Sequence, residues 1–172
     1  VEVSLRDEKG EEVAQGDVGE LFCRSPLLFN GYWENPEATA EALTDDGWCT
    51  VGDMGRHDDE GYLYLVDRKK DLIISGGVNV FPREIEEVLI AHPGVAEASV
   101  IGVPDEEWGE AVKAIVVKSG DVSEDDLKSY CRENLAKYKI PKTFAYLDVL
   151  PRNAGGKILK TELRDRSRAG SL

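Results

Sequence analysis

The sequence has no long hydrophobic run and contains one methionine and two histidines in 172 residues. No apolar stretch approaches the ~20 residues that a bilayer-spanning helix needs. The first ten residues, VEVSLRDEKG, lack the basic flank and apolar stretch of a secretory signal. We therefore expect a cytoplasmic protein without a transmembrane segment. Because the chain does not begin with methionine, we also expect it to start within a longer polypeptide.

Cysteine is also scarce, with Cys23, Cys49 and Cys131 far apart along the sequence. None of them has the paired spacing of a zinc site, so no metal site is expected. An odd number of cysteines without a secretory signal predicts reduced thiols that serve as packing residues.

Acidic residues outnumber basic ones by 34 to 21, which gives a formal net charge of −13. This charge disfavours nonspecific binding to nucleic acid or to an anionic membrane. It leaves room for small anionic ligands, which need only a few locally placed cations. A hydrophobic content of 41% predicts a packed globular core.

Residues 1–67 are predicted to form short strands separated by turns. The expected strands are residues 1–5, 19–23 and 62–66, and strong turn signals lie at residues 45–47 and 58–61. One helix is expected at residues 36–42, with Asn35 as its N-cap and Pro36 at its first position.

Residues 68–172 change to mixed strand and helix patterns. A strand at residues 72–74 ends at two glycines, and Pro82 opens a helix whose apolar face is Ile85, Val88 and Leu89. Further elements are expected as strands at residues 96–103, 112–117 and 144–147, a helix capped by Ser123 and a final helix capped by Thr161.

This order predicts an α+β protein in two parts. Residues 1–67 would form a partial, β-rich subdomain of a larger domain. Residues 68–172 would form a small α+β domain with a three-stranded sheet, a β-hairpin and helices. The boundary is expected near residues 67–70, where charged residues separate two strand patterns.

Two stretches in the middle of the chain contain residue types that a core does not need. In GWCTVGDMG, residues 47–55, the Asp53 carboxylate suits a ribose diol, although a Gly-Asp pair alone usually marks a turn. In residues 67–86, Arg68 and Lys70 precede Ser75, Gly76 and Gly77, whose missing Cβ atoms permit close backbone approach to a ligand. The plain alternative for the second stretch is a hairpin followed by a capped helix.

Two later stretches raise the same choice. Trp108, in PDEEWG, either stacks on a base or simply covers a sheet edge. In LPRNAGGKILK, residues 150–160, two glycines predict a mobile loop that carries Lys157, whose ammonium could meet a phosphate or a developing oxyanion. The plain alternative is a solvated surface lysine.

Taken in order, these stretches resemble the motif set of the adenylate-forming enzymes, which include acyl-CoA synthetases, peptide-synthetase adenylation domains and luciferases. GELFCRS, GYWENPEAT, YKIP and LPRNAGGK add to the likeness, which runs from Val18 to Arg164. Several separate motifs in the right order and spacing make it highly specific. The loop SGGVNVFPREIE is more similar to free-standing CoA ligases than to peptide synthetases.

The resemblance implies a role for each matching residue. Asp53 would hold the ATP ribose, Arg68 would contact the nucleotide, and Asn79 would lie near the adenylate. Lys70 would be the hinge of the small domain. Ser75, Gly76 and Gly77 would bind coenzyme A by lining the pantetheine tunnel, and Lys157 would be the catalytic lysine of adenylation.

The implied reaction consumes ATP, Mg²⁺ and coenzyme A and activates a fatty or aryl acid through an acyl-AMP. The family's phosphate loop, magnesium-binding glutamate and acyl pocket do not occur in this sequence. We therefore expect the missing amino-terminal part of the large domain to be a partner, and this chain alone to be inactive. The alternatives are a peptide-synthetase adenylation domain that loads a carrier protein and a non-catalytic interaction module.

Overall fold

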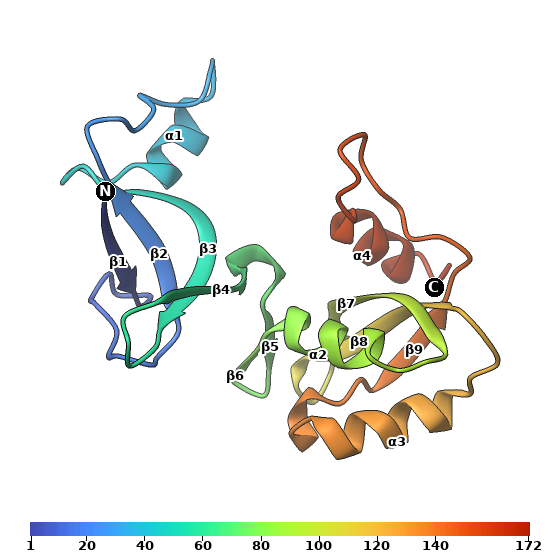
Figure 1. Cartoon of the computed structure of the whole chain (residues 1–172). Helices are drawn as coiled ribbons and strands as arrows, with labels where there is room; N and C mark the ends of the chain where they lie inside the picture. Colours follow the sequence, from blue (N-terminus) through green and yellow to red (C-terminus); the bar gives the residue numbers. More distant parts are fainter. The chain divides into compact units, whose positions relative to one another are not determined.

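The computed structural model describes all residues, 1–172, and the chain divides into two compact units. The amino-terminal unit is Val1–Lys70 and the carboxy-terminal unit is Asp71–Leu172 (Figure 1). Both units mix strands with helices, as predicted for an α+β protein. None of the helices is long and apolar enough to cross a membrane.

The amino-terminal unit is a four-stranded antiparallel sheet with one helix. Its strands β1 (Glu2–Arg6), β2 (Gly19–Arg24), β3 (Cys49–His57) and β4 (Leu63–Arg68) lie side by side in chain order. Helix α1 (Pro36–Ala42) begins as predicted, because the Asn35 side chain accepts a hydrogen bond of 3.0 Å from the Ala38 amide. The stretch around Asp53 differs from the turn that its glycines suggested and lies within β3.

Trp48 organises the small core of this unit. Its ring is 9% exposed, with the guanidinium groups of Arg6 and Arg24 at 4.7 and 4.6 Å from its centroid. Such cation–π contacts let two charged side chains cover an apolar ring without losing their own hydration. Leu5, Ala42, Cys49 and Met54 complete the buried apolar set.

The carboxy-terminal unit is built on one long antiparallel pair, β7 (Val95–Asp105) and β8 (Gly109–Lys118). Strand β9 (Thr143–Tyr146) runs parallel to β8, so these strands form the three-stranded sheet that was predicted. The predicted hairpin, β5 (Ile73–Ser75) and β6 (Val78–Val80), joins β8 through the single pair Ser75–Gly109. The hairpin therefore extends the sheet to five strands.

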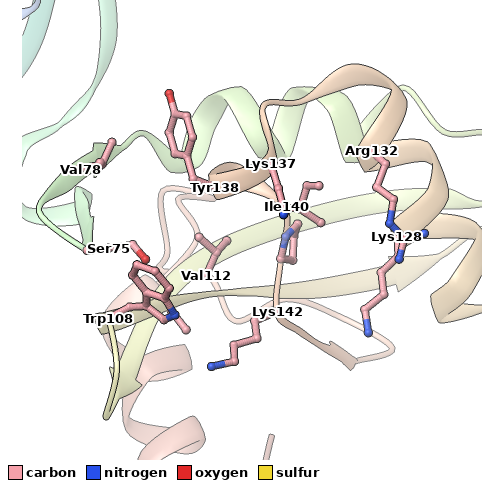
Figure 2. A pocket seen from close by; sticks show the side chains of 13 residues that line it. Ser75, Val78, Trp108, Val112, Lys128, Arg132, Lys137, Tyr138, Ile140 and Lys142 are labelled. Atoms are coloured by element: carbon pink, nitrogen blue, oxygen red, sulfur yellow. The ribbon is translucent and has the colours of Figure 1, made fainter.

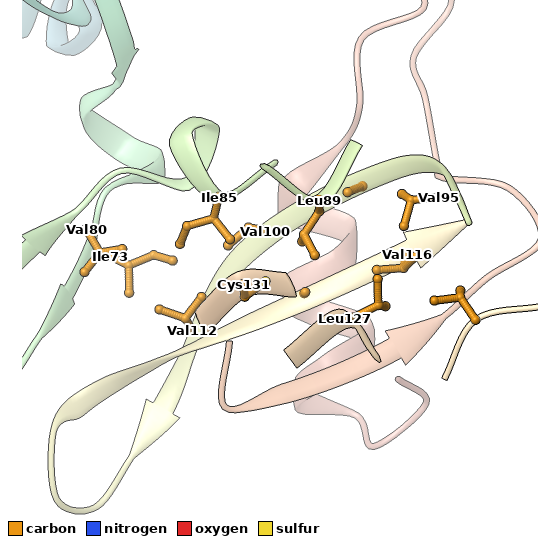
Figure 3. Close-up of a cluster of buried hydrophobic side chains, with 13 residues drawn as sticks. Ile73, Val80, Ile85, Leu89, Val95, Val100, Val112, Val116, Leu127 and Cys131 are labelled. Carbon is orange, nitrogen blue, oxygen red and sulfur yellow. The ribbon is translucent and has the colours of Figure 1, made fainter. Parts of the chain in front are cut away.

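Both faces of this sheet are buried, because side chains alternate along each strand. One face packs under α2 (Pro82–Ile90) and α3 (Glu124–Asn134), and Figure 3 shows its apolar cluster. The opposite face packs under α4 (Lys160–Arg168). The first face contributes Val100, Val112 and Val116, and the second contributes Ile101 and Ile115.

Two helix starts that the sequence predicted had different outcomes. Ser123 and Asp126 form a reciprocal capping box at α3, as expected. Thr161 is not a cap, because α4 begins one residue earlier and Leu159 occupies the cap position without a side-chain hydrogen bond. Two short 3₁₀ turns, η1 (Lys69–Asp71) and η2 (Lys137–Lys139), were not predicted.

Helix α4 is attached by one buried leucine and two ion pairs. Leu163 is fully buried in the second core. Lys160 Nζ lies 2.7 Å from Glu86 Oε1 on α2, and Arg164 Nη2 lies 2.9 Å from Asp71 Oδ1. These contacts fix the start of the helix that follows the loop of Lys157.

We predict that Leu163→Ala lowers the free energy of unfolding of the carboxy-terminal unit by about 2–5 kcal/mol, because it leaves a cavity beneath α4. Urea unfolding measures the change. Glu162→Ala, at the exposed neighbouring position, should shift stability by less than about 0.5 kcal/mol. Equal effects of the two substitutions would contradict this account of α4 docking.

Candidate functional site

Asp53 and Arg68 are cross-strand partners on β3 and β4. Arg68 Nη1 lies 2.9 Å from Asp53 Oδ1, and Arg68 Nη2 donates to the Val51 carbonyl oxygen at 2.9 Å. The Arg68 Nε is buried and has no hydrogen-bond partner, which is unusual for a native donor. The two side chains remain 23% and 36% exposed, so the pair stays accessible to a polar ligand.

A cavity of about 570 Å³ lies beside this ion pair, entirely within the amino-terminal unit. Arg68 and Lys70 line it together with Tyr32 and the backbone around Gly52. A buried Glu20 carboxylate supports one wall, accepting from the Thr50 hydroxyl at 2.8 Å and pairing with Lys69 Nζ at 2.7 Å. The cavity therefore combines an aromatic ring, cations and open backbone.

The glycine pair forms a tight two-residue turn between β5 and β6. Gly76 and Gly77 have φ angles of 57° and 77°, which is the left-handed conformation that this hairpin turn requires. The Gly76 amide donates to the Trp108 carbonyl oxygen at 2.9 Å. A Cβ atom on Gly76 would lie 2.6 Å from the Trp108 ring, so only glycine lets the indole pack here.

A pocket of about 750 Å³ opens beside this turn, and Figure 2 shows its lining. Ser75, Gly76 and Trp108 form part of the wall. The remaining wall is apolar at Val78, Ala111, Val112, Tyr138, Ile140 and Pro141, and its charged side chains are all cations: Lys128, Arg132, Lys137 and Lys142. In a chain with a net charge of −13, this pocket is a local concentration of basic side chains.

Two of these cations are paired with carboxylates: Lys128 Nζ lies 2.6 Å from Glu124 Oε1 within α3, and Lys142 is paired at the rim of the pocket. Lys142 Nζ lies 2.5 Å from Asp105 Oδ2. This hydrogen bond lowers the pKa of Asp105 and raises the pKa of Lys142, so both groups stay charged near neutral pH. Sequence analysis did not identify the basic residues of this pocket, because they come from separate segments and lie outside the recognised motifs.

Asn79 does not join this pocket. It pairs with Ile74 on the hairpin, whereas Ser75 pairs with Val78, which does line the pocket. Because neighbouring strand residues point to opposite faces, the exposed Asn79 side chain lies on the other face of the hairpin.

Lys157 lies on an exposed turn, and its ammonium group makes no hydrogen bond or ion pair. Its backbone is held firmly. Asn153 Oδ1 accepts from the amides of Gly155 and Lys157 at 3.0 and 2.9 Å, and the Asn153 amide donates to the Lys157 carbonyl oxygen. Arg152 also donates to the Gly156 carbonyl oxygen and pairs with Glu97 on β7.

The expected mobile loop is therefore a hydrogen-bonded hairpin, closed by the bridge between Arg152 and Ile158. Gly156, with φ of 81°, makes the tight turn possible. Asn153, which accepts the hydrogen bonds of this turn, is part of the recognised motif LPRNAGGK. The motif alone did not predict that its side chain would be the acceptor. The arrangement presents one unpaired ammonium on an ordered support.

Comparison with known proteins defines the class. Residues 84–157 match the AMP-binding enzyme C-terminal domain family. With the relatives described next, this match shows that the chain belongs to the adenylate-forming superfamily, as the motif resemblance predicted.

The curated relatives are acid–CoA ligases. A long-chain-fatty-acid–CoA ligase of Mycobacterium tuberculosis is 51% identical over 166 residues, which cover 96% of this chain and 33% of the relative. A 2-succinylbenzoate–CoA ligase of Bacillus mycoides is 50% identical over 161 residues, with 93% and 33% covered. The chain thus spans about a third of the length of the curated relatives it matches.

A solved structure from the same group is similar along nearly the whole chain. The o-succinylbenzoate CoA synthetase of Bacillus subtilis, in complex with its acyl-adenylate intermediate, has a TM-score of 0.89 and 43% sequence identity. The match covers 95% of this chain and 34% of that one. ATP-bound MatB from Rhodopseudomonas palustris has a TM-score of 0.90 and 40% identity, covering 97% and 34%.

We predict that Asn153→Ala loosens the Lys157 turn, because two amides lose their acceptor at roughly 0.5–1.5 kcal/mol each. The loss of both bonds, about 1–3 kcal/mol together, should accelerate trypsin cleavage after Lys157 roughly 5- to 150-fold. Asn153→Asp keeps an acceptor oxygen and should retain the slow rate. An unchanged rate in Asn153→Ala would show that the side chain does not hold the turn.

Proposed function

We propose that this chain is the carboxy-terminal part of an AMP-forming acyl-CoA synthetase, an acid–thiol ligase that activates a fatty or aryl acid with ATP and transfers it to coenzyme A. The observation that carries the proposal is the cationic pocket beside the glycine turn, in a chain that is otherwise strongly acidic. Coenzyme A is a polyanion with an aromatic base. Four basic side chains and Trp108 match that chemistry.

The rest of the enzyme would be an amino-terminal part of the large domain, which residues 1–67 would complete. The amino-terminal unit supports this, because the edge strand β4 carries Leu63, Tyr64 and Leu65 at 37, 47 and 52% exposure. Large apolar side chains in a row on a sheet edge favour coverage by further protein. Residues 68–172 would be the small mobile domain.

In the first half-reaction, the substrate carboxylate attacks the α-phosphorus of ATP, and pyrophosphate leaves. Asp53 would accept hydrogen bonds from the ribose hydroxyls, exchanging part of its contact with Arg68 for the sugar. Arg68 would then have a charge and donors available for the nucleotide. Asn79, on the other face of the hairpin, would lie near the adenylate.

Lys157 would supply the positive charge that this step needs, between the acyl carboxylate and the α-phosphate oxygens. Catalysis of nucleotidyl transfer depends mainly on positioning and charge neutralisation. The unpaired ammonium on an ordered turn suits that role, because no existing ion pair has to break first. The Asn153 acceptor and the Arg152 contacts support the turn from below.

In the second half-reaction, the small domain would rotate at Lys70 and withdraw Lys157. Ser75, Gly76 and Gly77 would then guide the pantetheine thiol to the acyl carbonyl, and AMP would leave. The nucleotide end of coenzyme A would be held in the cationic pocket. The absence of Cβ atoms at both glycines keeps the backbone open to a narrow ligand arm.

Mg²⁺ would accompany ATP, but the residues of this chain do not fit a magnesium site. No group of three or more carboxylate, histidine or cysteine side chains could hold a metal ion. A magnesium site would therefore have to come from the amino-terminal part.

A peptide-synthetase adenylation domain would share the first half-reaction and deliver to a carrier protein. The cationic pocket favours coenzyme A, because the nucleotide phosphates are the groups that a carrier-bound arm lacks. The discriminating assay gives the full-length enzyme either coenzyme A or a carrier protein as the thiol. Transfer to the carrier alone would replace the proposed acceptor.

We predict that Lys157→Ala in the full-length enzyme lowers the rate of acyl-AMP formation by about 10²–10³-fold, because one transition-state charge is lost. Thioester formation from preformed acyl-AMP should be nearly unchanged. Pyrophosphate release and thioester formation are measured separately. Lys9→Ala, at an exposed position in the turn between β1 and β2, is the control. Equal losses in both half-reactions would refute the role of Lys157.

We predict that Lys70→Pro blocks the rotation while leaving adenylation intact, because proline fixes φ near −65° and restricts the preceding residue. The acyl-AMP burst should persist, and steady-state thioester production should fall. Lys70→Ala, which keeps backbone freedom, should retain both. Full thioester production by Lys70→Pro would count against a hinge here.

A further inference from the structure

Two of the three cysteines meet in the amino-terminal unit. Cys23, on β2, and Cys49, on β3, are directly opposite partners in the antiparallel ladder. Sequence analysis treated them as distant packing thiols, because 25 residues separate them along the chain. Both are reduced in this structure.

Their geometry suits a covalent bond. Directly opposite residues of antiparallel strands have Cα atoms about 4.5–5.5 Å apart, and disulfides span about 4.4–6.8 Å between Cα atoms. Opposite side chains also point to the same face of the sheet. Cβ atoms of such pairs lie about 4.5–5.5 Å apart, against about 3.5–4.5 Å in a disulfide, so closure needs a shift of about an ångström.

The pair lies at one end of the ladder between these two strands. Cys49 is the first residue of β3, and Cys23 is the last but one of β2. The pair is therefore at the end of the β2–β3 ladder; on their outer sides, Cys23 pairs with Val3 on β1 and Cys49 forms a bridge with Leu43. Thr50 is the neighbouring partner of Phe22, so the rest of the ladder continues on one side only.

We propose that Cys23 and Cys49 form a reversible cross-strand disulfide when the protein meets a peroxide. The site is separate from the proposed nucleotide-binding pair, and the inference does not depend on the proposed ligase activity. The reactant that oxidises the pair is a two-electron oxidant of the hydroperoxide class.

The two thiols have different roles in this chemistry. Burial raises the pKa of the Cys49 thiol, whereas Cys23 is only partly buried. The Cys23 thiolate attacks one peroxide oxygen and the O–O bond breaks. Cys23 becomes a sulfenic acid, and the departing hydroxide takes up a proton to give the first water. The Cys49 sulfur then attacks the Cys23 sulfur, forming S–S and releasing the second water. Two thiols and one hydrogen peroxide thus give one disulfide and two waters.

Cys131 is an internal control for the oxidation of Cys23 and Cys49. It is fully buried on α3 of the carboxy-terminal unit, and burial raises its pKa to about 11. No other cysteine belongs to that unit. It therefore has neither thiolate character nor a partner, and oxidation should leave it alone.

Closure would join the two ends of a segment that contains α1. Residues 24–48 would become a covalent loop, anchored where Arg24 and Trp48 already contact each other at 4.6 Å. The disulfide would thus reinforce an existing approach of the two strand ends. Thioredoxin-type reductants or dithiothreitol would reopen it.

The test uses the 172-residue chain, first reduced and then treated with hydrogen peroxide in native buffer. Titratable thiols, counted after denaturation, should fall from three to one, and the mass should fall by two hydrogen atoms. Tryptic digestion without reductant should link the peptide of residues 10–24 to that of residues 25–56. Dithiothreitol should separate them again.

Three variants and one condition sharpen the result. Cys131→Ser should still form the bond and lose both thiols. Cys23→Ser should keep its two thiols and form no intramolecular disulfide. Cys49→Ser should also fail to form the intramolecular disulfide. If burial of the serine prevents this variant from folding, Cys23→Ser alone tests the point. Oxidation in denaturing urea should scatter the links among all three cysteines, because the strand pairing is gone.

The proposal fails if the native chain keeps three thiols, gains oxygen at its cysteines without a link, or links through Cys131. Cross-links only between separate chains, seen on a non-reducing gel, would also overturn it. A 23–49 link that forms equally well in urea would show that strand register is not its cause.

Discussion

The antiparallel pair of β7 and β8 is the constraint on which the carboxy-terminal unit depends. Both of its faces carry buried side chains, which belong to one of two cores. Its turn carries Trp108, which sets the position of the glycine turn through the contact with Gly76. Its other face holds Leu163 and so fixes the helix that follows Lys157. The glycine turn and the helix after Lys157 are therefore both positioned by the β7–β8 pair.

Charge is distributed unevenly over this scaffold. Acidic residues dominate the chain, yet every charged side chain that lines the pocket beside the glycine turn is a cation. Elsewhere, carboxylates are used structurally: Glu86 accepts from the Val100 amide at 2.8 Å and pairs with Lys160, and Asp71 pairs with Arg164. Satisfied pairs of this kind anchor α4, whereas Lys157 is left unpaired. Lys160 thus helps to hold the fold, whereas the Lys157 ammonium is not engaged in it.

Local patterns predicted local structure well. The cap at Asn35 and the capping box at Ser123 were correct, because each depends on residues within one helical turn. The predictions of secondary structure were wrong where a glycine is compatible with two backbone conformations. The glycines around Asp53 lie in strand β3, and those before Lys157 tighten a hairpin instead of loosening a loop. Sheet pairing and a side-chain acceptor decided both cases, and neither is visible in a local pattern. The roles assigned to the site residues stay predictions.

The sequence alone determined the class of protein, the order of elements and the motif residues, because hydrophobic period, caps and motif spacing are encoded along the chain. Tertiary structure alone decided what meets across the chain. It brought Lys128, Arg132, Lys137 and Lys142 to one pocket, turned Asn79 to the other face of the hairpin, and set Cys23 opposite Cys49. Strand register causes the last two, because a shift of one residue reverses every side chain, and register is fixed only when the sheet forms.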